Sequence, residues 1–260
     1  MVDYLYDGTF EGFLCCIHAH YYRGKAAGIY RKDDYQASML HESRIIETEE
    51  EKATRVYEAI ERKISKDDLR RIYRVFLSSD ENKENLLLAY IRLGFREGDR
   101  ISLLHSNPIV FDVQQCEHKV SIETHRIKGL ARFSALRGGR HPSGHSGCGE
   151  ENGTEILYCC IEPDHDILEI VADHFSDRLK NNPFIMHDKR RKKAVFASGG
   201  SWYISGFTDA DLPLLGVGER EYRDLWKKYF ETIAIPERIN PNCQKRFMPV
   251  RYWKNLTEFH

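Results

Sequence analysis

The last stretch of the sequence, Ile235 to Phe259, combines cationic, amide and aromatic side chains and has almost no apolar periodicity. Cationic groups neutralise phosphates, amides hydrogen-bond base edges, and flat rings stack on bases. This tail is therefore a candidate nucleic-acid-binding segment. The alternative is an ordered arm that wraps its own domain, with the aromatic residues as anchors. The candidate contacts are Arg238, Gln244, Arg246, Arg251, Tyr252, Trp253 and Lys254.

A second basic segment runs from His187 to Lys193, between two apolar strand candidates, and ends in five consecutive cations, KRRKK. At the tip of a hairpin these charges would attract phosphate, although an ordinary solvated turn has the same composition.

A third group of polar residues suggests an anion pocket. His174 and Arg178 lie one helical turn apart beside an apolar stripe, so they are placed to share a phosphate or a carboxylate. Partial desolvation lowers the pKa of a histidine and keeps the ring usable as a base. The alternative is a half-buried His174 bonded to backbone. The candidate catalytic residues, if they converge, are His125, Arg132, His174, Arg178 and Asp188.

Catalytic motifs are missing from the sequence. It holds no Walker loop, GxSxG elbow, HExxH or deaminase signature, and no cluster of carboxylates typical of a metal-dependent nuclease. His141, His145 and Cys148 lie in the glycine-rich segment Gly138 to Gly153, but a structural zinc site needs a fourth ligand and a rigid frame. We expect a flexible surface insert over 138–153, no metal site and no cofactor.

Composition narrows the class of protein. The 260 residues are 30% charged with a formal net charge of −1, so any affinity for nucleic acid must come from local patches. No segment is long and apolar enough for a membrane span, and no secretory leader opens the chain. The seven cysteines include no CxxC, which is typical of reduced thiols. We expect a cytoplasmic protein without membrane contact.

The elements that must position these residues follow an α+β pattern. We expect a strand at Tyr4 to Tyr6, an apolar helix capped by Asp7, a connecting loop from Gly24 to Glu50, and helices from Glu51 to Lys128. Ser65 and Asp68 resemble a capping box. After Gly129 short strands surround a helix at about 165–179, and an amphipathic helix carries Tyr222 to Ile233. The prediction is a helical middle section, 51–128, beside a small, mainly antiparallel sheet within 129–260.

Five blocks of the sequence resemble a known family. They are YDGTFEGFLCCIHAHY (6–21), HRIKGLARF (125–133), IEPDHDILEIVADHFSDRL (161–179), LWKKYFETIAIPER (225–238) and the tail. In these blocks the chain is similar to the DNA metabolism or repair family built on the domain of unknown function DUF4130, as a single domain over residues 1–260. The resemblance also implies a specific role for Asp188 and Arg191 beyond that of a solvated turn, and it makes Arg191 a further candidate contact for nucleic acid.

The resemblance implies a cellular theme and a partner rather than a reaction. Members are typically encoded beside a radical-SAM protein of DNA modification or repair, and this chain lacks the cysteine triad of such a cluster itself. Three hypotheses follow. The first is an accessory protein that holds nucleic acid, or a modified nucleotide, for the radical-SAM partner. The second is a lesion- or nucleotide-processing enzyme with a pocket of His, Arg and Asp residues. The third is a protein-interaction subunit without nucleic-acid contact.

Overall fold

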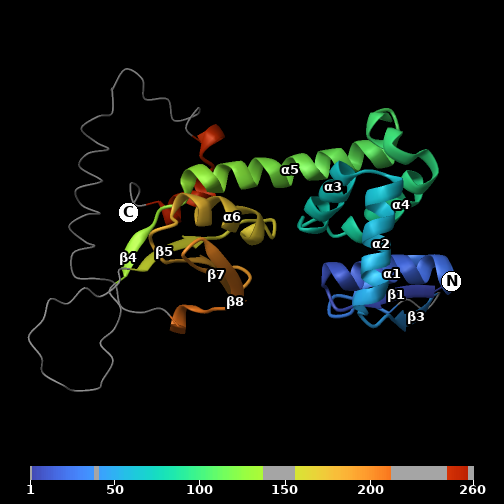
Figure 1. Ribbon diagram of the computed structural model, residues 1–260, viewed down its shortest axis with the longest axis horizontal. Coiled ribbons are helices and arrows are strands. Elements are labelled where there is room, and N and C mark those ends of the chain that lie inside the picture. The colour runs from blue at the N-terminus through green and yellow to red at the C-terminus, as the bar shows by residue number, and fades with distance from the viewer. Residues whose placement is uncertain (1, 38–40, 137–155, 212–244, 257–260) are drawn as a thin grey trace, which may run out of the picture. The chain divides into compact units, whose positions relative to one another are not determined.

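The computed structural model describes residues 2–37, 41–136, 156–211 and 245–256 (Figure 1). The chain divides into two compact units, Met1–Ser121 and Ile122–His260, and the division falls inside one long helix, α5 (Pro108–Leu130). Helices and two separate sheets make up the units, so the predicted α+β class is confirmed.

The first unit contains a three-stranded parallel sheet with the order β2-β1-β3. Its strands are β1 (Val2–Tyr6), β2 (Ala26–Arg31) and β3 (Glu42–Ile45), and α1 (Phe10–Tyr22) connects β1 to β2. The predicted βα start is therefore correct. The predicted loop from Gly24 to Glu50 is wrong, because β2 and β3 lie within it. Both are short; β3 (ESRI) is mostly polar, and β2 (AAGIYR) begins with small residues that are uncommon in strands. Their order therefore depends on pairing with the buried β1 rather than on their own periodicity.

The N-cap of α1 is not the predicted Asp7. The N-cap is Thr9, whose Oγ1 accepts a hydrogen bond from the Gly12 amide at 3.0 Å. Asp7 instead accepts hydrogen bonds from the Thr9 amide at 2.9 Å and from the Thr48 hydroxyl at 2.8 Å. Gly8 between them has φ +89°, so the chain turns at a residue that tolerates this backbone before the helix begins.

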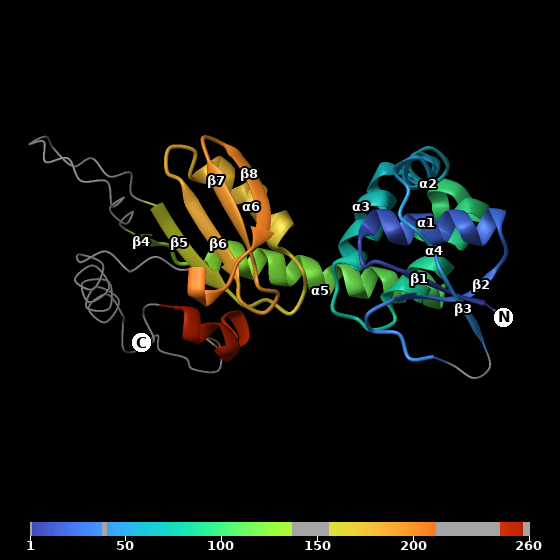
Figure 2. The same ribbon diagram turned by 90° about the horizontal axis from the view of Figure 1, so that it is seen from below.

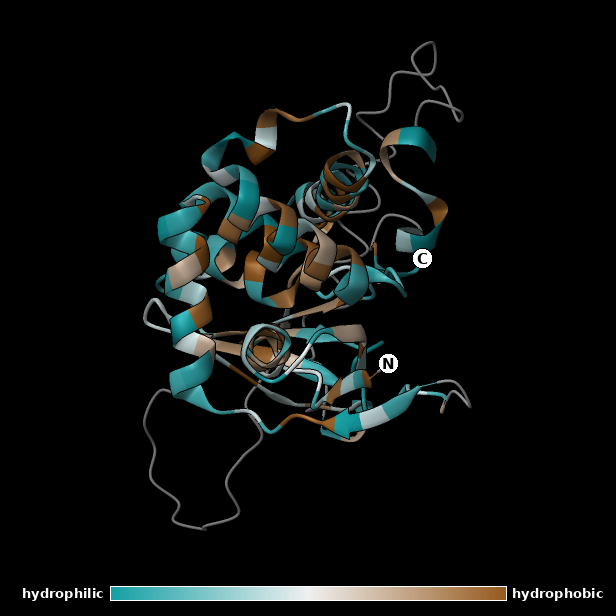
Figure 3. Ribbon diagram, turned by 90° about the vertical axis from the view of Figure 1, so that its right-hand side faces the viewer, coloured by the Kyte–Doolittle hydropathy of each residue, from teal (hydrophilic) through white to brown (hydrophobic). Residues whose placement is uncertain are grey.

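The remaining helices of the first unit are α2 (Glu50–Lys63), α3 (Lys66–Phe76), α4 (Lys83–Glu97), the 3-10 helix η1 (Gly98–Leu103) and the beginning of α5. The capping box is confirmed, since Ser65 Oγ accepts from the Asp68 amide at 2.9 Å and donates to its carboxylate at 2.6 Å. In Figure 3 teal and brown residues alternate along these helices, as amphipathic helices with one buried face require. Tyr6, Phe13, Ile60 and Leu87 are among the fully buried side chains.

The second unit is built on a five-stranded mixed sheet with the order β4-β5-β6-β7-β8 (Figure 2). The strands are β4 (Ser134–Leu136), β5 (Ile156–Ile161), β6 (Phe184–Asp188), β7 (Lys193–Ser198) and β8 (Ser201–Gly206). All five lie after Gly129, where the sequence predicts short strands around a helix. The β5–β6 pair is parallel and the other three pairs are antiparallel. The predicted mainly antiparallel sheet holds for this unit alone, since the first sheet is wholly parallel.

Helix α6 (Leu168–Arg178) joins the two parallel strands β5 and β6. It begins three residues later than predicted, because the chain from Glu162 to Ile167 is held by side-chain contacts. Val171, Phe175, Phe184 and Met186 are buried in the core of this unit. The short 3-10 helices η2 (Asp209–Asp211) and η4 (Val250–Asn255) follow the sheet. The cysteines of the described ranges are free thiols, as expected. The predicted insert 138–153 and the predicted helix Tyr222 to Ile233 lie outside the described residues.

Candidate functional site

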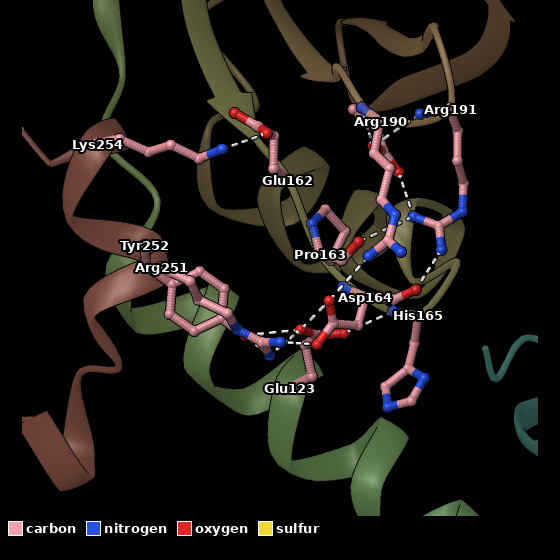
Figure 4. Close-up of polar contacts among 11 residues, drawn as sticks. Glu123, Glu162, Pro163, Asp164, His165, Arg190, Arg191, Arg251, Tyr252 and Lys254 are labelled. Carbon is pink, nitrogen blue, oxygen red and sulfur yellow. Dashed lines mark hydrogen bonds and ion pairs between the residues drawn. The ribbon is translucent and has the colours of Figure 1, made fainter. Parts of the chain in front are cut away.

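The main polar cluster of the second unit lies where the two parallel strands β5 and β6 end. The chain leaves β5 through Glu162, Pro163, Asp164 and His165, and leaves β6 through the four-residue turn 189–192. The carboxyl ends of neighbouring parallel strands are where α/β proteins commonly place ligands. We call this region, with the adjoining η4, the β5–β6 edge; Figure 4 shows its polar contacts.

Glu123 on α5 is the buried centre of the β5–β6 edge, with a side chain 3% exposed. Its Oε1 accepts a hydrogen bond from the Asp164 amide at 3.1 Å, and its Oε2 accepts one from the His165 amide at 2.7 Å. The hydroxyl of Tyr252 and the guanidinium of Arg251 each donate to Oε1 at 2.6 Å. One carboxylate therefore fixes the chain after β5 and holds the C-terminal η4 against it (Figure 4).

Four predicted contacts of the tail lie in η4, and three of them, Arg251, Tyr252 and Lys254, are paired with acidic residues of the same unit. The ring of Tyr252 is buried at 3% exposure, and burial, then Glu123, raises the pKa of its hydroxyl to about 12. Arg251 also pairs with Asp164, and Lys254 pairs with Glu162. Here the tail packs against its own domain, as in the alternative interpretation of an ordered arm. Arg251 and Lys254 nevertheless remain about half exposed.

The turn between β6 and β7 has the hairpin geometry predicted for the cationic run. Asp188, fully buried, accepts hydrogen bonds from the amides of Arg190 and Arg191, and from the Arg191 guanidinium at 2.9 Å. Arg191 also donates to the carbonyls of Pro163 at 3.1 Å and Asp164 at 2.5 Å. Burial raises the pKa of Asp188, and Arg191 opposes that shift. Asp188 and Arg191 thus connect the end of β6 to the end of β5, although the two strand ends are far apart in the sequence.

The outer cations of the turn make only exposed contacts. Arg190 Nη1 lies 2.8 Å from Asp164, and Lys189 Nζ lies 3.1 Å from Asp209. Such exposed pairs contribute roughly 0 to 1 kcal/mol, so these cations are held in place weakly. Lys189, Arg190, Arg251 and Lys254 therefore present four positive charges at one edge, each within reach of an anion from solvent.

The predicted anion pocket is brought together only in part. His174 and Arg178 lie on α6 as expected, and desolvation, then the charges of Lys128 and Arg178, lowers the pKa of His174. The nearby acid that opposes this shift is Asp177, whereas Asp188 is occupied in its own turn. His125 is exposed on α5.

The remaining predicted site residues are spread over other positions. Arg132 donates to the carbonyl of Gly129 at 3.1 Å, and its charge opposes the burial that raises the pKa of Cys159 to about 12. Arg246 is exposed, and its carbonyl accepts from Arg126 at 3.4 Å. Trp253 donates to the Met248 carbonyl at 2.9 Å. Arg238 and Gln244 lie outside the described residues.

Glu123, Glu162 and Asp164 were not predicted as site residues. Glu123 lies in a helix of mixed polarity, where a glutamate ordinarily faces solvent, so no local signal marks it as buried. Asp164 was read as part of a helix start. Only the pairing of β5 with β6 brings these carboxylates to the cations of the turn and of η4.

In the described ranges, no group of three or more His, Cys, Asp or Glu side chains is arranged to hold a metal ion. The potential ligands His141, His145 and Cys148 lie outside those ranges. No described helix is both long and apolar enough to cross a bilayer.

Comparison with known proteins identifies the family. The family model of DUF4130, a domain of unknown function, matches residues 81–258. The chain belongs to the DUF4130 family. The matched range contains α4, α5 and every residue of the β5–β6 edge, while the resembling block 6–21 lies before it. No curated protein and no solved structure matches the chain.

Proposed function

We propose that this protein is a nucleic-acid-binding accessory protein of DNA metabolism, and that the β5–β6 edge contacts the phosphate backbone. The observation that carries the proposal is the convergence of cations from two distant segments. Lys189 and Arg190 come from the turn after β6, and Arg251 and Lys254 come from η4. Two segments joined in this way, through Glu123 and Asp164, bring four partly exposed cations to one edge of a chain whose net charge is −1, and each cation is paired with a carboxylate of the same unit.

The geometry favours backbone contact over base recognition. Guanidinium and ammonium groups at the edge are exposed, whereas the ring of Tyr252 is buried and therefore is not presented for stacking. Phosphate contacts carry no sequence information, so binding through this edge is insensitive to sequence and sensitive to salt.

The cellular role is proposed from the family resemblance. We propose that the nucleic acid is DNA and that the protein holds it for a radical-SAM enzyme of DNA modification or repair. The incomplete convergence of the His/Arg/Asp residues is consistent with a holding role more than with a reaction carried out by this chain.

The test replaces Lys189, Arg190 and Lys254 by Ala together. These three cations make exposed contacts, so folding is retained, whereas Arg251 is left in place because it binds the buried Glu123. Binding of mixed-sequence labelled DNA is measured by fluorescence anisotropy over a series of salt concentrations. We expect weaker binding to all sequences and a salt slope shallower by up to about 3, since each lost phosphate contact removes about one unit.

A matched control removes the same charge elsewhere. Arg55, Arg70 and Arg96 in the first unit are also exposed and paired with Glu51, Asp67 and Glu97, so their triple Ala variant should leave the salt slope unchanged. An equal loss of affinity in both triple variants would assign the effect to net charge and refute the β5–β6 edge. Wild-type protein without measurable binding at low salt would refute nucleic-acid binding itself.

A second function is favoured by the apolar residues next to the tail cations. Phe247 and Val250 are 70% and 53% exposed, which is typical of a protein contact more than of a phosphate contact. We propose as the alternative that this part of the tail binds a protein partner. Replacement of Phe247 and Val250 by Ser should then abolish partner co-purification and leave DNA binding unchanged. Loss of DNA binding alone would contradict it.

A further inference from the structure

Asp164 lies between the two arginines that the proposed phosphate contact uses. Its carboxylate is 2.8 Å from Arg190 Nη1 on one side and pairs with Arg251 on the other (Figure 4). Arg190 belongs to the turn after β6 and Arg251 to η4, so this one carboxylate joins two segments whose arginines are 61 positions apart in the sequence.

The backbone of Asp164 is fixed independently of its side chain. Its amide donates to Glu123 Oε1 at 3.1 Å, and its carbonyl accepts from Arg191 at 2.5 Å. The side chain itself remains 41% exposed. The carboxylate can therefore rotate into solvent without disturbing the chain, while the two arginines keep their positions through the turn and through Tyr252.

A carboxylate and a phosphate oxygen offer the same acceptors to a guanidinium group. We infer that Asp164 is a built-in competitor for nucleic-acid phosphate: in the free protein its carboxylate occupies the anion site formed by Arg190 and Arg251. Phosphate enters when the Asp164 carboxylate turns away. This inference rests on the proposed function and names its regulation. Glu162, paired with Lys254, holds the adjacent cation in the same way.

Competition predicts the direction in which a substitution changes the affinity for nucleic acid. A residue that merely supports the fold weakens binding when it is replaced, whereas a competitor strengthens it. Asp164→Asn removes the negative charge and keeps the size of the side chain. The Arg190 guanidinium then becomes available to phosphate, and Arg251, which stays bound to Glu123, loses one of its two carboxylate partners. Asp164→Glu keeps the charge and should bind as wild type does.

The experiment measures binding of the full chain to a mixed-sequence labelled single-stranded and double-stranded DNA. We expect Asp164→Asn to bind about two- to fivefold more tightly at low salt, the range that a half-exposed ion pair spans. We also expect its salt slope to be steeper by about 1, for one more cation in contact with phosphate. Glu51→Gln and Asp67→Asn are the controls, because each frees an exposed arginine of the first unit with the same change in net charge.

The outcomes separate the inference from the proposed function. Equal or weaker binding by Asp164→Asn, with wild type binding normally, overturns the competitor and leaves the DNA-binding function intact. Equal gains in Asp164→Asn and in both controls assign the effect to net charge and also overturn it. Tighter binding by Asp164→Asn, with wild type binding normally and both controls unchanged, supports the inference. Absence of binding by wild type and by Asp164→Asn, at low salt and with intact folding, refutes both.

Discussion

Replacement of Glu123 by Gln tests whether one buried carboxylate holds the β5–β6 edge together. Glu123 accepts hydrogen bonds from two backbone amides, a phenol and a guanidinium group. In Gln, one oxygen becomes an amino group, which cannot accept from the amide that it faces. An unsatisfied buried donor costs about 1 to 3 kcal/mol, and each of the other bonds loses roughly 1 kcal/mol when its acceptor becomes neutral.

The unsatisfied donor and the three weakened bonds together predict a loss of about 4 to 6 kcal/mol in the free energy of unfolding, which overlaps the range of about 3 to 5 kcal/mol found when a buried ion pair loses one partner. Urea unfolding followed by tryptophan fluorescence reports on the correct part of the chain, because Trp202, Trp226 and Trp253 all belong to the second unit. Limited trypsin digestion should also cleave after Arg251 faster in the variant, since Glu123 no longer anchors η4.

Two controls define what would refute this reasoning. Glu51→Gln removes an exposed carboxylate paired with Arg55 and should change the free energy of unfolding by less than about 0.5 kcal/mol. Glu123→Asp keeps the charge and shortens the side chain, so its loss should be smaller than that of Glu123→Gln. If Glu123→Gln lies within about 1 kcal/mol of wild type, the carboxylate does not hold the edge, and another contact fixes the tail.

Two further predictions concern stability. Folded Tyr252 keeps its proton up to a pKa of about 12, whereas an unfolded tyrosine releases it near 10, so this residue's stabilisation is complete below pH 10 and is lost between pH 10 and 12. The free energy of unfolding, measured by urea titration at several pH values across that window, should fall less steeply with pH in Tyr252→Phe than in wild type. An equal fall in both proteins would contradict the raised pKa. At Gly12 an added Cβ would lie 2.3 Å from Asp7 Oδ1 and 2.8 Å from Thr48 Oγ1, so Gly12→Ala should cost about 1 to 3 kcal/mol. Gly129→Ala, with nothing within 4 Å, should be neutral or stabilising. Urea unfolding of both variants measures the two effects, and equal effects at both sites would refute the steric argument.

The sequence was sufficient for elements whose stability is local. The four-residue spacing in α2, the capping residues Ser65 and Asp68, and the apolar runs of β5 to β8 each contain their own signal, because side-chain periodicity and caps act within one element. The hairpin around the KRRKK run followed in the same way. The strands β2 and β3 were missed, because a strand of small or polar residues next to a buried one is ordered by its neighbour.

The sequence predicted the cations of the candidate site but not the acidic residues that pair with them. Residue types in the tail and in the turn after β6 indicated cations suited to phosphate, and that information is contained in the side chains themselves. Their partners were decided by the tertiary structure. Glu123 and Asp164 are ordinary acidic residues in the sequence, and they become the centre of the β5–β6 edge because the parallel pairing of β5 and β6 brings together segments far apart along the chain. Burial and pairing are properties of that arrangement, so no local pattern encodes them.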